Sequence, residues 1–108
     1  MSEVLITQGR VRATVTLGVG VTTFAIAESR SVVVTGDGGA NVIATITGGV
    51  VGQHLTVQFV DGLVTLTDDN THAADSVDLS GAFVSADDTI LELYYDGISW
   101  YEVSRSGN

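Results

Sequence analysis

Alternation of apolar and polar residues is the dominant pattern along the chain. The stretch "RVRATVTL" (residues 10–17) places Val11, Ala13, Val15 and Leu17 on one face, with Arg and Thr on the other. The stretch "HLTVQFV" repeats this alternation, and "SVVVT", "NVIATIT", "LVTLT", "TILELYY" and "ISWYEVS" are rich in β-branched or aromatic residues. No segment of helical length has apolar residues at spacings of three and four. The pattern predicts an all-β protein.

Two Asp-Gly pairs mark turns between these runs. Asp61-Gly62 separates "TVQFV" from "LVTLT", and Asp96-Gly97 separates "LELYY" from "ISWYEV". We expect an antiparallel hairpin at each pair, because a type I′ turn needs positive φ at both central residues. Further breaks at residues 18–20, "TGDGGAN", "TGGVVGQ" and "DDNTHAADS" give eight or nine strands in all. Strands at this spacing predict a small antiparallel β-sandwich, jelly-roll-like or barrel domain.

The length of 108 residues suits one domain. Residues 1–27 hold two alternating strands joined by Gly-Val-Gly, and we interpret them as a short N-terminal β arm ahead of a β-domain at residues 28–108. The chain has no Cys to form disulfides and neither Lys nor Pro to protect the edges of its sheets. Association of identical copies would cover such edges, so a homo-oligomer is expected.

The composition is strongly acidic, with 13 Asp and Glu against four Arg, a net charge of −9 and a pI near 4.1. This charge argues against binding to nucleic-acid phosphates and to anionic membranes. No apolar run approaches the length of about 20 residues that spans a bilayer, and the first residues lack the features of a signal peptide. No cofactor is implied.

The clearest candidate ligand loop is "DDNTHAADSVD", which contains oxygen-bearing side chains and one histidine. Two interpretations of it stay open: a calcium site, or a solvated acidic turn. The loop lacks the glycine and glutamate positions of an EF-hand. The residues concerned are Asp68, Asp69, Asn70, His72, Asp75 and Asp78.

Other polar features favour structural roles. "TGDGGAN" resembles a phosphate-binding loop only in its glycines, because a strand-like run follows it and the chain has no lysine. His54 begins a strand, Asp87-Asp88 reads as an exposed loop, and no serine lies in a nucleophile elbow. We therefore predict no enzymatic activity and no catalytic site, and we assign no metal-binding residues apart from the two interpretations left open for the loop at Asp68–Asp78.

Four of the seven aromatic residues lie in the last 16 positions, at Tyr94, Tyr95, Trp100 and Tyr101. They are interpreted mainly as core packing of a closing hairpin. The alternative is an exposed platform for sugars, which leaves a host-surface glycan open as a partner.

Residues 45 to 108 resemble a small β-domain found at the end of many tailed-phage virion proteins. The resemblance lies in a Gly-Gln turn (Gly52, Gln53), the step "LSGAF", Asp88-Thr89 and the closing pattern "DGxxWxExSRS" before a final Asn. The positions of that closing pattern are Asp96, Gly97, Trp100, Glu102, Ser104, Arg105 and Ser106. The loop "TDDNTHAADS" departs from the Gly-rich turn of the family.

The resemblance implies a trimeric, all-β virion component without catalytic function. The short chain favours a capsid decoration (cement) protein on the outer head surface, a homotrimer that binds the major capsid protein at three-fold positions. The alternative is a tail-fibre tip or another receptor-binding appendage. The predicted capsid or intersubunit contacts are Val4, Leu5, Ile6, Val11 and Val15, with ordinary strand roles as the competing interpretation.

Overall fold

The computed structural model describes residues 12–26, 29–36 and 40–106, and these ranges contain strands and loops but no helix. The strands are β1 (Arg12–Thr16), β2 (Thr23–Ala25), β3 (Ser31–Thr35), β4 (Asn41–Ile43), β5 (Thr45–Thr47), β6 (His54–Phe59), β7 (Val64–Leu66), β8 (Val77–Asp78), β9 (Phe83–Val84), β10 (Thr89–Tyr95) and β11 (Trp100–Arg105). The all-β prediction is therefore confirmed.

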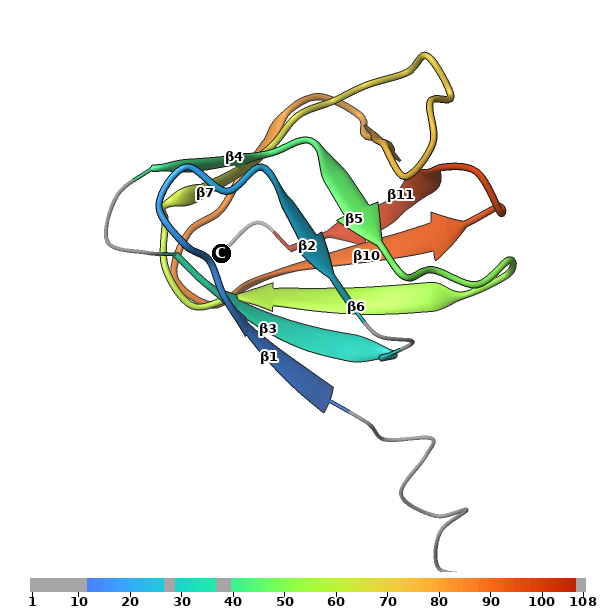
Figure 1. Cartoon of the computed structure of the whole chain (residues 1–108). Coiled ribbons are helices and arrows are strands. Elements are labelled where there is room, and N and C mark those ends of the chain that lie inside the picture. Colours follow the sequence, from blue (N-terminus) through green and yellow to red (C-terminus); the bar gives the residue numbers. More distant parts are fainter. Residues whose placement is uncertain (1–11, 27–28, 37–39, 107–108) are drawn as a thin grey trace, which may run out of the picture.

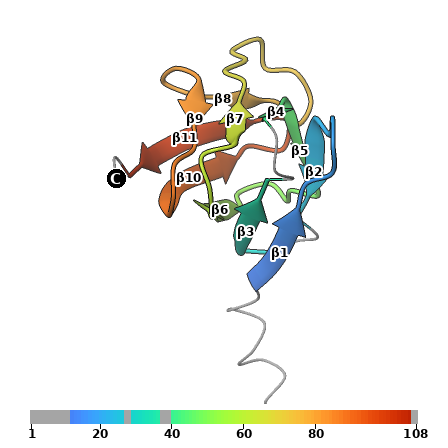
Figure 2. The same cartoon turned by 90° about the vertical axis from the view of Figure 1, so that its left-hand side faces the viewer.

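The strands wind into a solenoid-like stack (Figure 1). Successive turns of the chain place β1, β3 and β6 side by side and parallel, β4 beside β7, and β2 beside β5. A second view shows β1, β3, β6, β10 and β11 following one another along one side of the molecule (Figure 2). β10 pairs antiparallel with β6, β11 pairs antiparallel with β10, and β8 runs parallel to β11. The last turn of the stack is thus covered by an antiparallel hairpin.

This arrangement corrects the prediction of an antiparallel sandwich, jelly roll or barrel. Five of the eight pairings between described strands are parallel. Alternating strands of similar spacing suit both architectures, because periodicity reports which face is buried and not which strand is the neighbour.

The two Asp-Gly pairs have different outcomes. The pair at Asp96-Gly97 joins β10 to β11 as an antiparallel hairpin, as predicted. Gly97 has a φ of 103°, but Asp96 is not among the described residues with positive φ, so the predicted type I′ geometry is wrong. The predicted hairpin at Asp61-Gly62 is wrong, because β6 and β7 belong to different sheets and Gly62 is not among the glycines with positive φ. Asp61 instead makes a corner of the stack: its carboxylate accepts the backbone N–H of Leu63 at 3.1 Å and that of Gly36, on the preceding turn, at 3.1 Å.

Apolar side chains of successive turns line up in rows inside the stack. Ala13, Val32, Val57 and Leu91 form one such row across four neighbouring strands. Val32, Val57 and Leu91 are fully buried, as are the inward residues of the other sheets, among them Ile43, Ile46 and Leu66. The alternation in the sequence therefore identifies the buried face of these strands correctly.

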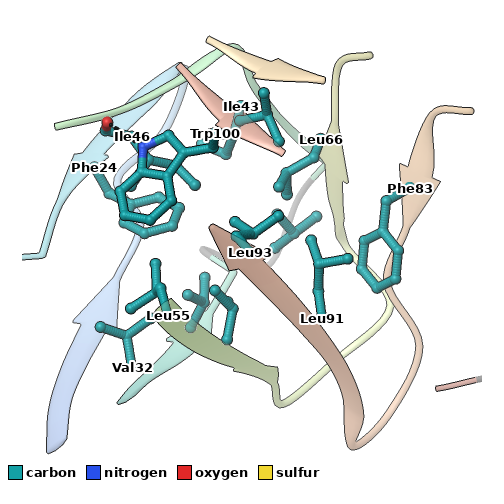
Figure 3. Close-up of a cluster of buried hydrophobic side chains, with 14 of the residues drawn as sticks. Phe24, Val32, Ile43, Ile46, Leu55, Leu66, Phe83, Leu91, Leu93 and Trp100 are labelled. Atoms are coloured by element: carbon teal, nitrogen blue, oxygen red, sulfur yellow. Dashed lines mark hydrogen bonds between the residues drawn. The ribbon is translucent and has the colours of Figure 1, made fainter. Parts of the chain in front are cut away.

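Trp100 closes the core at the hairpin end of the stack. Its side chain is fully buried beside the labelled residues Phe24 and Ile46 (Figure 3). Its indole N–H donates to the carbonyl of Ile46 at 3.0 Å, and its ring packs against Tyr95 with centroids 4.7 Å apart. Gly49 lies directly against both rings, so the turn after β5 can approach them only without a side chain.

The predicted boundary between an arm at residues 1–27 and a β-domain at residues 28–108 stays a prediction. Residues 12–25 include β1 and β2, which pair with β3 and β5 of the same chain. The part of the predicted arm before β1 lies outside the described residues, and its role stays a prediction.

Gly49→Ala should strongly destabilise the domain. The new Cβ would lie 2.7 Å from Trp100 Cζ2 and 2.8 Å from a Tyr95 ring carbon, and both rings are buried in the core. We expect a loss of about 2 to 3 kcal/mol in the free energy of unfolding, measured by urea titration. The neighbouring Val50→Ala, at an exposed side chain, should cost far less. Equal stability of the two variants would contradict this packing.

Ser99→Ala should be neutral or stabilising. The Ser99 hydroxyl is fully buried and has no hydrogen-bond partner within the described structure. Removing an unsatisfied buried hydroxyl relieves a desolvation cost of about 1 kcal/mol. Thermal unfolding of the variant should occur at the wild-type temperature or a few degrees above it, whereas a marked drop would reveal a partner for this hydroxyl.

Candidate functional site

The Gly-Gln turn is held by the glutamine side chain. Gly52 has a φ of 85°, a conformation that favours glycine. The carbonyl oxygen of the Gln53 side chain accepts the backbone N–H of Val50 at 2.9 Å, and its amide nitrogen donates to the Ser29 carbonyl at 2.6 Å. Gln53 therefore ties the β5–β6 turn to the preceding turn of the stack.

Asp96 holds the turn of the β10–β11 hairpin in place. One carboxylate oxygen accepts the backbone N–H groups of Ile98 at 2.8 Å and Ser99 at 2.9 Å, and the other lies 2.9 Å from His72 Nε2. The backbone donors of Ser99 and Ile98 hold the pKa of Asp96 well below its ordinary value. The contact between His72 and Asp96 joins the acidic loop, residues 68–78, to the β10–β11 hairpin.

Glu102 and Arg105 form a clasp between β11 and the loop after β8. Glu102 accepts the guanidinium of Arg105 at 2.7 Å and the backbone N–H of Ser80 at 2.9 Å, while Arg105 also donates to the Gly81 carbonyl. The Arg105 contact, opposed by partial burial and aided by Ser80, lowers the pKa of Glu102 to about 2. The Arg105 guanidinium also lies 5.2 Å from the centre of the Phe83 ring.

The carboxylates of the acidic loop, residues 68–78, accept hydrogen bonds from the loop itself and from the segments beside it. Asp68 accepts the N–H of Leu79 at 2.9 Å, Asp69 accepts the N–H of Thr71 at 3.0 Å, and Asp75 accepts the Tyr95 hydroxyl at 3.0 Å. No group of three His, Cys, Asp or Glu side chains suited to holding a metal occurs among the described residues. These hydrogen bonds give the three carboxylates a structural role, and the calcium site stays a prediction.

The Gly-rich stretch also has a structural contact. The backbone N–H of Gly36 points to the Asp61 carboxylate rather than to an open anion site. Residues 37–39 of this stretch lie outside the described residues.

The aromatic cluster is divided between the core and the surface. Trp100 and Tyr95 are buried, whereas Tyr94 and Tyr101 face outward from paired positions on β10 and β11. The Tyr94 ring meets the His54 ring edge-on at 5.3 Å. A sugar platform would therefore have to use Tyr94 or Tyr101, and the predicted core role is confirmed for the other two.

Two open hollows of about 350 Å³ each lie on the surface. The first is acidic and runs beside the clasp, lined by Asp78, Leu79, Ser80, Tyr101, Glu102 and Val103. The second combines positive charge with apolar side chains, and is lined by Arg30, Val50, Val51, Gly52, Gln53 and His54. We call it the Arg30 hollow. The sequence identified the Gly-Gln turn and His54 as notable but did not single out Val50, Val51 or Arg30. Arg30 could not be found, because it meets residues 50–54 only through the stacking of β3 beside β6.

The predicted contact residues are only partly placed. Val4, Leu5, Ile6 and Val11 lie outside the described residues. Val15, on β1, is half-buried and packs inward against the core. β1 forms one edge of the six-stranded sheet, with β3 as its neighbour in the described structure.

Neither a known protein family, nor a curated protein, nor a solved structure matches this chain. No described segment is a helix long and apolar enough to cross a membrane.

Glu102→Gln should make the stability less dependent on acid. The pKa of Glu102 is about 2 in the folded chain and 4.5 without these contacts, so its stabilising effect is present above pH 4.5 and is lost as the pH falls toward 2. At pH 7 the variant should lose about 1 to 2 kcal/mol in the free energy of unfolding. Urea titrations at pH 7, 4.5 and 3 should show this gap closing.

The matched control for this experiment is Glu92→Gln. Glu92 is an exposed carboxylate that accepts a hydrogen bond from the Ser104 hydroxyl and has no contact with Arg105. The control should follow the wild-type pH profile more closely. A Glu102→Gln variant with the same acid sensitivity as the wild type would contradict the role of the clasp.

Proposed function

We propose that this chain is a structural protein of a tailed-phage virion, a homotrimeric capsid decoration protein that binds the outer head surface at three-fold positions and stabilises the shell. Its partners in this proposal are two further copies of itself and the major capsid protein. The proposal includes no enzymatic activity.

The observation that carries the proposal is the closing motif. Each of its polar and aromatic positions has a definite contact: Trp100 seals the core, Asp96 shapes the hairpin turn, and Glu102 and Arg105 form the clasp. The spacing of the motif therefore follows from the way a hairpin covers the end of the stack. A sequence that matches this pattern in a virion protein should close its fold in the same way, which supports a common architecture.

Surface features support association into an oligomer. β1 leaves one long sheet edge without a neighbouring strand in the described structure, and the chain has no Lys or Pro to discourage pairing there. Several aliphatic side chains are also exposed, among them Val50 and Val51 in the Arg30 hollow, and Ile98. A trimer would cover some of this surface, and three copies suit a three-fold position on a shell.

One observation favours the alternative function of a tail-fibre tip or other receptor-binding appendage. The hairpin covers one end of the stack, while at the other end the β1 edge has no neighbouring strand among the described residues, as expected where a shaft precedes a terminal domain. Under this alternative the outward Tyr94, Tyr101 and His54 would be candidates for contact with a host-surface glycan.

The copy number per virion distinguishes these two functions. We expect quantitative mass spectrometry of purified virions to find hundreds of copies, in a fixed ratio to the major capsid protein, because a decoration protein occupies three-fold positions over the whole shell. A few trimers per virion would contradict the head location and favour the tail. Absence from virions that contain the major capsid protein would contradict both.

A further inference from the structure

The Arg30 hollow brings together a positive charge without an ion pair in the described structure and two exposed apolar side chains. Of the two arginines whose side chains are described, Arg105 is engaged by Glu102, whereas Arg30 has no ion pair within the described structure. Val50 and Val51, in the same hollow, are 50 % and 69 % exposed. Such a surface suits a partner that brings carboxylate groups together with small apolar side chains.

Charge restricts how identical copies can associate. Each copy carries a net charge of −9, so two copies repel one another at long range. Stable contact requires local attraction where the surfaces meet, and the Arg30 hollow offers both a cation and apolar area. The surface opposite it should therefore be acidic.

The chain itself presents such a surface in the loop between β7 and β8. This loop projects from the body of the molecule in both views (Figures 1 and 2). Ala73 and Ala74 of this loop are exposed, and they lie close in sequence to Asp69. Asp69 uses one carboxylate oxygen for the Thr71 contacts, which leaves the other without a hydrogen bond in the described structure. The loop is held in place by the His72–Asp96 contact, so little ordering is needed on binding.

We propose that the Arg30 hollow receives the acidic β7–β8 loop of a second copy of this chain. Arg30 of one copy pairs with the Asp69 carboxylate of the next, and the two loop alanines pack on Val50 and Val51. The contact joins two different surfaces, so it can close into a ring of three. The inference rests on the homotrimer of the proposed function, and names the surfaces that form it.

Arg30→Glu tests this interface. Arg30 is exposed, so the variant should fold with an unchanged unfolding temperature. We expect the dissociation constant of the trimer, from sedimentation and native mass spectrometry, to rise at least tenfold. Adding Asn70→Arg to the loop should restore much of the affinity, because it places a cation opposite the new Glu. A charge swap is sharper than a salt titration, since salt weakens the local attraction and the overall repulsion together.

Two controls match the changes in charge. Ala40→Glu combined with Ala82→Glu adds the same two negative charges at exposed sites outside the hollow, and should weaken the trimer far less than Arg30→Glu. Asp69→Asn keeps the oxygen that accepts the Thr71 contacts and should weaken the trimer, whereas Asp87→Asn, at an exposed turn, should not.

The outcomes separate this interface from the proposed function. A trimer that is unaffected by Arg30→Glu would overturn the interface while the trimer stands. A wild-type chain that is monomeric at all concentrations tested would overturn the interface and the trimer together. The location in the virion would still be decided independently by the copy number.

Discussion

The hydrogen bond from the Trp100 indole to the Ile46 carbonyl is the contact on which the fold most depends. It joins residues that are 54 positions apart, and it does so inside a core from which water is excluded. Because the indole N–H has this acceptor, the largest side chain of the chain can be fully buried without leaving a polar atom unsatisfied. The hairpin thereby covers the last turn of the stack, and Gly49 is required where its backbone meets the two rings.

The acidic side chains hold turns of the backbone in place, and together they give the molecule a large negative charge. Asp61, Asp68, Asp69 and Asp96 each accept backbone N–H groups at corners where the strands leave donors unpaired. A carboxylate is a strong acceptor for such donors, so each corner held in this way adds one negative charge to the molecule. With few arginines to balance them, these charges accumulate to a strongly acidic molecule that repels its own copies unless surfaces of opposite character meet.

The sequence was sufficient to predict an all-β chain, the buried faces of its longer strands, the hairpin at Asp96-Gly97 and the burial of Trp100, but it predicted eight or nine strands where the described residues form eleven. It was not sufficient to predict the order of the strands, because alternation in β3 or β6 is the same whether the neighbour is parallel or antiparallel. The hairpin predicted at Asp61-Gly62 was wrong for a related reason, because an Asp-Gly pair suits a corner between two sheets as well as a hairpin. The Arg30 hollow was missed because its residues come from segments that meet only once β3 and β6 are known to be adjacent.

One end of the stack is covered by the β10–β11 hairpin and the other ends at the edge strand β1, so the two ends can contact other chains only in different ways. At the covered end, β10 continues the inward row of Val32 and Val57 with Leu91, and β11 follows it. At the other end the row finishes at Ala13 on β1, whose outer edge has no strand beside it in the described structure. A strand added at this edge would have to alternate in the same register, with small or β-branched residues facing inward. The contacts proposed at the Arg30 hollow would need no such register, since they depend on charge and shape rather than on backbone pairing. In the proposed assembly, identical copies therefore join through the Arg30 hollow, and the β1 edge is left for pairing with a different chain.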